Sequence, residues 1–343
     1  MHHGNSRRVG WIFASTSTRA ARETAIGQCA DDRCDTNSFR SFDAAGEHGR
    51  APLWIVFGCG PWIRVGSADR QIKTTEVTMA GYAIRGGKEG KERLNLLARV
   101  MLPTTSQLLN AVGINSGMRC LDVGCGGGHV TLLMARLVGP EGKIVGTDAD
   151  GEVIALARED ARIAKLDNVE FRRADAAMCQ ATGEYDVVYA RFLLSHLSEP
   201  ERCLEAMVRA CNVKGAIVLE DIDFSGSFCY PTCAAYDRYT RLYQDIVKRR
   251  GGDANIGPKL PGMLRKVSAE NVLVNVIQPT HLEGEGKLMA SITMQRIADS
   301  VISERLAAEG EVQQIITELN DAAAESETVM SLPRVFQVWG RRA

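Results

Sequence analysis

Residues 121–129, Leu-Asp-Val-Gly-Cys-Gly-Gly-Gly-His, place an acid two positions before glycines at every second residue. Glycine lets the backbone turn sharply, removes the Cβ where a ligand must lie against the chain, and leaves the amides of the next helix accessible. The third position of the dinucleotide pattern G-x-G-x-x-G is His129 here, so a pyrophosphate ligand is disfavoured. Asp122 instead suits a ligand whose amino-acid end carries an ammonium group.

The segments around this motif predict a doubly wound α/β fold. From Met118 onward, short strands alternate with amphipathic helices, and right-handed crossovers make the strands parallel, with the ligand-facing loops at their carboxyl ends. The expected strands are 119–123, 143–147, 169–173, 185–190 and 216–222. The expected helices are 88–98, 130–137, 152–164 and 199–210.

The pattern changes after the fifth strand. We expect a helix at 234–249, a strand at 271–278, two helices within 287–324 and a last strand at 334–340. The two helices are interpreted as a lid near residues 285–326, inserted before the last strand, and an ordinary peripheral helical pair is an equally good interpretation.

The string D-x-G-x-G-x-G, the acid in Val145-Gly146-Thr147-Asp148 and the segment Phe171–Ala176 resemble the class I S-adenosylmethionine-dependent methyltransferases over roughly residues 80–343. Within that family the sequence is most similar to small-molecule enzymes, which include ubiquinone, menaquinone and natural-product methyltransferases. The resemblance implies a mostly parallel, seven-stranded Rossmann-like sheet. It also implies S-adenosyl-L-methionine as cofactor, with methyl transfer to an oxygen or carbon nucleophile of a small molecule.

The resemblance assigns a role to each landmark. Asp148 would accept hydrogen bonds from the ribose hydroxyls, Asp175 would receive the adenine amine, and Arg191 would line the methionine pocket. The expected cofactor-binding residues are Asp122, Gly124, Cys125, Gly126, Gly128, Asp148, Ala149, Asp175, Ala176 and Arg191. Asp148 and Asp175 could instead be turn or helix-capping acids, and Cys125 could be a small filler.

An oxygen nucleophile would need a base, and His196 is the candidate because it follows the fourth strand on the ligand-facing side. The alternative is a partly buried histidine that holds the loop. Glu220, Asp221 and Asp223 are further candidates for substrate contacts, although strand alternation directs neighbouring residues to different faces.

Two other functions stay open: a non-catalytic protein that binds S-adenosylmethionine, and a nicotinamide-dependent oxidoreductase. Nucleic-acid methylation is disfavoured because 190–193 read Ala-Arg-Phe-Leu where Asn/Asp-Pro-Pro-Tyr/Phe would be expected. The net charge of -1 and the pI of about 6.6 also give no overall sign of a nucleic-acid partner. The paired glutamates expected for protein arginine methylation are absent after the fourth strand.

Residues 1–78 sustain neither helical nor strand periodicity, so we expect a poorly structured extension and a domain boundary near Met79. A disordered extension, a small adaptor and translated upstream sequence are the alternatives, and the last is favoured. The apolar runs fall short of a membrane span, and no secretory signal is expected. Ten cysteines at irregular spacings predict reduced thiols in the cytoplasm and no metal site.

Overall fold

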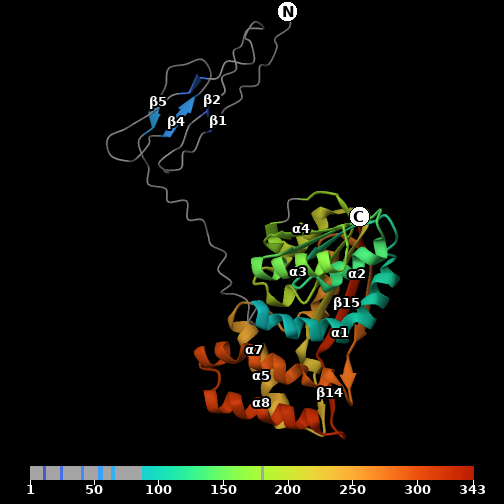
Figure 1. Cartoon of the computed structure of the whole chain (residues 1–343), viewed down its shortest axis with the longest axis vertical. Helices are drawn as coiled ribbons and strands as arrows, with labels where there is room; N and C mark the ends of the chain where they lie inside the picture. The colour runs from blue at the N-terminus through green and yellow to red at the C-terminus, as the bar shows by residue number, and fades with distance from the viewer. Residues whose placement is uncertain are drawn as a thin grey trace, which may run out of the picture. The chain divides into compact units, whose positions relative to one another are not determined.

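The computed structural model describes residues 87–178 and 181–343, except the side chains of 87–91 and of Met178, together with the backbone of five short strands nearer the N-terminus (Figure 1). The chain divides into two compact units, Met1–Val77 and Thr78–Ala343. In the first unit, β1, β4 and β5 form an antiparallel sheet and β2 pairs with β3. These strands are β1 (Trp11–Ile12), β2 (Thr24–Ala25), β3 (Arg40–Ser41), β4 (Leu53–Val56) and β5 (Ile63–Val65). The other residues of the predicted N-terminal extension, and the boundary predicted at Met79, lie outside the described residues.

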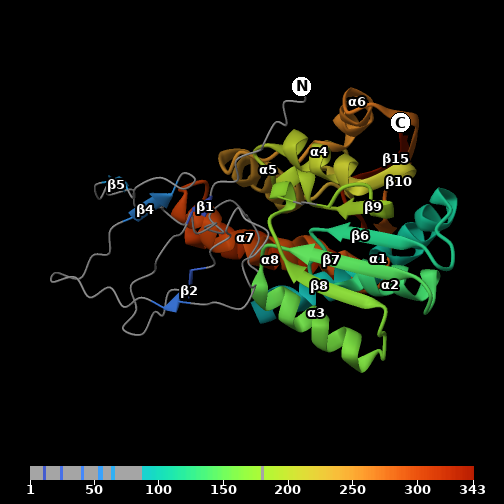
Figure 2. The same ribbon diagram turned by 90° about the horizontal axis from the view of Figure 1, so that it is seen from above.

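The second unit is built on a seven-stranded sheet in the order β12-β15-β10-β9-β6-β7-β8. The five strands from β8 to β10 in this order are parallel, and β15 runs antiparallel to both of its neighbours. The strands are β6 (Arg119–Val123), β7 (Lys143–Asp148), β8 (Val169–Arg173), β9 (Tyr185–Arg191), β10 (Cys211–Asp223), β12 (Ala269–Ile277) and β15 (Arg334–Arg342). The predicted mostly parallel, doubly wound sheet is confirmed (Figure 2).

Helices cover both faces of this sheet because its strands carry apolar residues on each side. Cys120 and Val187 pack toward α1 and α2, whereas their neighbours Leu121 and Val188 pack toward α4 and α6. The helices are α1 (Gly87–Val112), α2 (His129–Val138), α3 (Gly151–Ile163), α4 (Pro200–Ala210) and α6 (Leu260–Lys266). Short 3-10 turns join several elements: η2 (Ala176–Met178), η3 (Leu194–His196), η4 (Phe224–Gly226) and η5 (Gly257–Lys259).

Three further helices pack against one another and share a separate apolar core. They are α5 (Ala234–Arg249), α7 (Met289–Ser303) and α8 (Glu309–Ala324), and η6 (Glu285–Leu288) precedes α7. Met294, Ile297 and Leu319 are completely buried in their core. We call α5, η6, α7 and α8 the lid helices as a label only. The lid predicted near residues 285–326 and the alternative of an ordinary peripheral helical pair both stay predictions.

A small antiparallel sheet borders the lid helices, and the sequence did not predict it. Its order is β11-β14-β13, and the strands are β11 (Cys229–Tyr230), β13 (Thr280–His281) and β14 (Val329–Ser331). None of the helices within the described residues combines the length and the apolar character needed to cross a bilayer.

Candidate functional site

The turn between β6 and α2 depends on glycine for its shape. Gly124 and Gly128 have φ angles of 69° and 76°, in the left-handed region that favours glycine. A Cβ on Gly124 would lie 2.8 Å from a methyl carbon of Leu193, and one on Gly128 would lie 2.7 Å from the Phe171 ring. The turn therefore needs glycine both for its conformation and for the space around it.

Helix α2 begins at this turn with its first amides available to a ligand. Gly128 is the N-cap residue and no side chain caps the helix. The first N–H groups of a helix lack partners within it, and the helix dipole adds partial positive charge there. The end of the turn can therefore bind the carboxylate of an amino acid.

Asp148, at the end of β7, lies beside the glycine turn. Its Oδ2 accepts a hydrogen bond of 2.9 Å from the amide of Gly126, and its Oδ1 accepts one of 2.9 Å from the amide of Asp150. Burial raises the pKa of Asp148, and these backbone hydrogen bonds oppose the rise. Each carboxylate oxygen can accept more than one hydrogen bond, so ribose hydroxyls can be accommodated as well. The adjacent Ala149 presents its carbonyl to Arg173 at 3.0 Å.

Asp122 lies beneath the turn rather than on its surface. The residue is buried, and its Oδ2 accepts a hydrogen bond of 2.6 Å from the hydroxyl of Thr131 in α2. Burial raises the pKa of Asp122 to about 7, against the opposing effects of the Thr131 hydrogen bond and the positive charge of Arg191. The carboxylate therefore links strand to helix, and its contact with a ligand ammonium stays a prediction.

Asp175 follows β8, next to the end of β7. The amide of Ala174 donates to the Asp148 carbonyl at 2.9 Å, which joins the two strand ends. Asp175 is exposed, and its Oδ1 accepts a hydrogen bond of 2.8 Å from the amide of Ala177 in the turn that starts at Ala176. This is the capping geometry weighed as an alternative. Its role toward an adenine amine stays a prediction.

Cys125 lies half-buried within the turn. Its amide donates to the Thr147 carbonyl at 2.9 Å, and burial raises the pKa of its thiol. The thiol is therefore protonated at neutral pH and is a weak nucleophile, in agreement with a filling role. The six cysteines within the described residues are free thiols.

Arg191, at the end of β9, belongs to a buried polar network under the sheet. Its Nη1 donates to the hydroxyl of Thr105 in α1 at 3.2 Å. Thr105 and Tyr189 both donate to Oε2 of Glu220, and Gln337 of β15 donates to its Oε1 at 2.7 Å. The network holds the end of β9 against α1 and the neighbouring strands. Its members Thr105 of α1 and Gln337 of β15 were not predicted from the sequence.

The acids of β10 are occupied by protein contacts. Glu220 lies in the network described above, and Asp221 accepts a hydrogen bond from the amide of Ser195 at 3.1 Å on the other face. Asp223 forms a 2.6 Å ion pair with Arg334. All three are buried. The expected alternation is observed, but these side chains are not positioned as substrate contacts.

His196 ends the 3-10 turn that follows β9. Burial, together with the nearby positive charge of Arg93, lowers the pKa of His196 to about 3. The imidazole is therefore neutral at physiological pH and is a poor proton acceptor, because an effective general base has a pKa near the operating pH. Its role as a base stays a prediction, and its geometry also fits the structural alternative.

Helix α1 covers the glycine turn, which the sequence did not predict. Leu94 lies 3.9 Å from where a Cβ of Gly126 would be, and Nε2 of His129 is 2.8 Å from Oδ1 of Asn95. Arg93, the preceding residue, is buried and donates to the hydroxyl of Thr293 in α7 at 3.2 Å. The sequence did offer one signal for this contact, because Arg93 lies on the apolar face of the helix predicted at 88–98.

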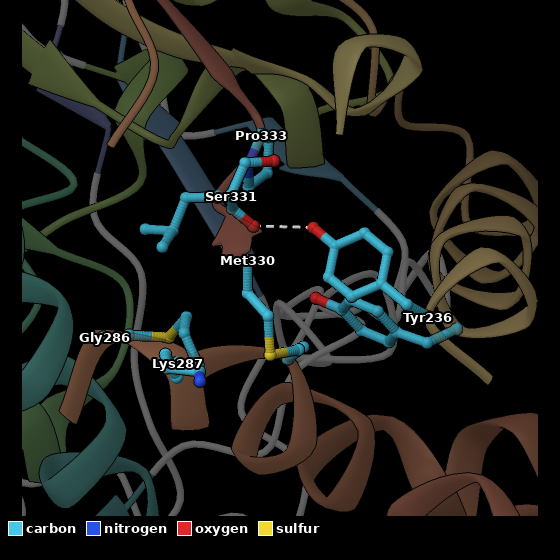
Figure 3. A pocket seen from close by; sticks show the side chains of 10 residues that line it. Tyr236, Gly286, Lys287, Met330, Ser331 and Pro333 are labelled. Carbon is cyan, nitrogen blue, oxygen red and sulfur yellow. Dashed lines mark hydrogen bonds between the residues drawn. The ribbon is translucent and has the colours of Figure 1, made fainter. Parts of the chain in front are cut away.

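A small cavity lies where the lid helices meet the start of β15. Tyr236 and Tyr239 of α5 line it together with Lys287, Met289 and other residues of 286–290 and 330–333. The Tyr236 hydroxyl donates to the Ser331 carbonyl at 2.6 Å (Figure 3). Because Arg334 pairs in register with Asp223, the cavity borders the carboxyl end of β10.

A family model described as "Methyltransferase domain" matches residues 114–255. Over these residues the chain is similar to methyltransferase domains, in agreement with the resemblance to the class I S-adenosylmethionine-dependent methyltransferases. The matched residues include β6 to β10, the glycine turn and every predicted site residue. S-Adenosyl-L-methionine is the cofactor that this similarity implies, and the site fits it through the glycine positions that a Cβ would fill and the acids at neighbouring strand ends.

Curated relatives support the methyltransferase domain. The ubiquinone/menaquinone biosynthesis C-methyltransferases UbiE of Salmonella arizonae and Salmonella newport are each 29% identical over 134 residues, covering 38% of this chain and 53% of each relative. The chain thus matches about half the length of these relatives.

Among solved structures, a putative methyltransferase from Bacillus halodurans has a TM-score of 0.49 at 18% identity, covering 69% of this chain and 97% of its own. The geranyl diphosphate C-methyltransferase of Streptomyces coelicolor has a TM-score of 0.45 at 12% identity, covering 74% and 83%.

Proposed function

We propose that this chain transfers a methyl group from S-adenosylmethionine to an oxygen or carbon nucleophile of a small molecule. The observation that carries the proposal is the juxtaposition of the glycine turn and Asp148, joined by the hydrogen bond from the Gly126 amide. The UbiE relatives are named as C-methyltransferases, which supports a carbon nucleophile among the alternatives.

When bound, S-adenosylmethionine supplies an electron-poor methyl group on a good leaving group. The chain has to bind and orient it: the first amides of α2 hold the amino-acid carboxylate, Asp148 the ribose and Asp175 the adenine amine. Holding the nucleophile in line with the methyl group contributes up to about 7–11 kcal/mol in favourable intramolecular models. Positioning therefore supplies most of the catalysis.

His196 has a modest role in this reaction, which is to orient the acceptor. A neutral imidazole with a lowered pKa can accept a hydrogen bond from an acceptor hydroxyl and orient it, but it withdraws a proton poorly. A carbon nucleophile activated by its own substituents, or an acceptor that is already ionised, would need no base from the chain. A cytoplasmic location is part of the proposal and follows from the reduced thiols expected from the cysteine spacing.

The assignment of Asp148 to cofactor binding is tested by substituting Asp148 and the nearby Asp150. Asp148→Ala removes hydrogen bonds to a charged acceptor worth about 1.5–3 kcal/mol, so affinity for S-adenosylhomocysteine should fall about 10- to 100-fold by calorimetry. Asp150→Ala is the matched control, because Asp150 caps α3 through the amides of Glu152 and Val153. It should cost about 1 kcal/mol of folding stability and leave the cofactor affinity unchanged.

The activity itself is tested by incubating the full chain with isotope-labelled S-adenosylmethionine and a panel of phenols, quinols and carbonyl compounds with acidic C–H bonds. Mass spectrometry should detect a labelled methyl group on one acceptor class. Tight cofactor binding with no transfer to any member would instead support a non-catalytic binding protein.

A further inference from the structure

Arg93 is a buried cation that donates a hydrogen bond to a neutral side chain. Its side chain is 9% exposed, and its Nε donates to the Thr293 hydroxyl. Among the residues that the structure describes, no carboxylate forms an ion pair with Arg93. A guanidinium carries five N–H donors, so most of its hydrogen-bonding capacity remains for a ligand.

The guanidinium lies on the lid side of the site. Thr293 belongs to α7, and the charge of Arg93 contributes to the lowered pKa of His196 and opposes the burial that raises the pKa of Tyr239. The glycine turn contacts α1 through the next two residues, Leu94 and Asn95, instead. Arg93 thus faces the lid helices through Thr293, whereas its two neighbours contact the glycine turn.

A second buried cation borders the cavity that Tyr239 lines. Lys287 is 4% exposed, and its ammonium donates to the backbone carbonyl of Glu325. Over the described part of the chain, Lys287 has no carboxylate partner. Lys287 lines the cavity, and Arg93 is close enough to the lining residue Tyr239 for its charge to act on that hydroxyl, so the two buried cations favour an anion on this side of the site.

We propose that the methyl acceptor carries a compact oxyanion, a carboxylate or phosphate, on an apolar body, and that Arg93 binds this oxyanion beneath the lid helices. The inference rests on the proposed function. An arginine fork matches such oxygens in a two-point contact, and the ligand charge offsets the cost of burying the guanidinium.

The apolar part of the acceptor would lie against the cavity wall formed by Met289, Met330 and Leu332. The cavity has room for about one water-sized molecule, so a larger body must displace side chains. Methionine suits this role because it is unbranched and adapts its shape at low cost.

The test measures binding of three probes to the full chain saturated with S-adenosylhomocysteine: benzoate, phenyl phosphate and the neutral benzamide. Calorimetry should show that one or both anions bind at least about tenfold more tightly than benzamide. The stronger of the two anions identifies the oxyanion. Arg93→Gln should abolish the preference, whereas Arg99→Gln, an exposed arginine of the same helix paired with Glu285, should retain it.

Three outcomes would overturn the inference: no preference for either anion in the wild type, an undiminished preference in Arg93→Gln, or a parallel loss of S-adenosylhomocysteine affinity in that variant. The last would assign the guanidinium to the cofactor carboxylate. A wild-type chain that does not bind S-adenosylhomocysteine would instead refute the proposed function.

Arg93→Lys covers the case in which Arg93→Gln does not fold. It keeps the charge and loses the fork, so both anions should bind more weakly while benzamide is unaffected. Unchanged affinity for the anions in Arg93→Lys would contradict a two-point contact.

Discussion

The glycine turn and the lid helices both pack against α1, yet they are specified in different ways. The turn depends on backbone conformation within a few residues, and its contacts with Asp148 connect neighbouring strands. The lid helices depend on side chains that pack over long separations, such as Met294 of α7 and Leu319 of α8. A substitution in the turn should therefore act on the backbone of the proposed cofactor site, whereas one in the lid helices should act first on packing.

The largest expected effect breaks the turn. Gly128→Ala should cost about 1–2 kcal/mol for the left-handed backbone and about 1–3 kcal/mol more for the collision with Phe171. Its affinity for S-adenosylhomocysteine should fall more than about tenfold. Gly113→Ala is the matched control, because Gly113 has a φ of 88° with no atom within 4 Å of a Cβ.

Thermal unfolding and calorimetry of both glycine variants give the result. Gly113→Ala should lose about 1–2 kcal/mol of stability and keep its cofactor affinity. Equal affinities for the two variants would show that the space around Gly128 is not needed for binding.

Damage to the lid core should separate stability from cofactor binding. Met294 is completely buried, so Met294→Ala should lower the free energy of unfolding by about 2–5 kcal/mol. In conditions where the variant is folded, its S-adenosylhomocysteine affinity should stay within about twofold of the wild type. Leu288→Ala, at a site that is 41% exposed, should change stability by less than about 0.5 kcal/mol. A large loss of cofactor affinity in Met294→Ala would mean that the two regions are coupled.

A smaller effect is expected from the carboxyl group beneath the turn. Burial raises the pKa of Asp122 from 3.8 to about 7 in the folded chain, so the folded state binds a proton more tightly than the unfolded state. Its contribution to stability is therefore complete below pH 3.8 and is lost as the pH rises to about 7.

Asp122→Asn removes this titration. Between acid and neutral pH, the free energy of unfolding of the wild type should therefore fall by about 1–3 kcal/mol more than that of the variant, as measured by denaturant unfolding at each pH. The same pH dependence in wild type and variant would show that Asp122 is ionised in the folded chain.

The smallest expected effect concerns His196. Because its pKa is lowered to about 3, turnover should show no inflection near pH 6.5 from this residue. His196→Gln should lower kcat by less than the 10²- to 10⁴-fold that general base catalysis typically contributes, on the order of tenfold at most. A hundredfold loss together with the disappearance of a pH inflection would restore His196 as the base.

The core of the fold could be predicted because its signals are local. Strands 119–123 and 169–173 were predicted to the residue, since short apolar runs bounded by turns define them. Helix α1 was recognised at its start but continues through Pro103 to Val112, because packing of its apolar face outweighs the proline.

The remaining structure depends on contacts that a single sequence does not display. The sheet β11-β14-β13 pairs Cys229 with Met330 and Thr280 with Ser331, far apart in the sequence, through strands of two or three residues that are too short to show a period. In the site, the glycines and Asp148 were recognisable from their spacing. The contact of Arg93 with Thr293 spans 200 positions and follows from packing alone.

The glycine turn and Asp148 are proposed to bind the adenosyl and amino-acid parts of S-adenosylmethionine rather than a dinucleotide. Calorimetric titration of the full chain with S-adenosylhomocysteine and, separately, with NADH distinguishes the two ligands. We expect saturable one-to-one binding of S-adenosylhomocysteine and none of NADH. Binding of NADH without binding of S-adenosylhomocysteine would contradict the proposed site.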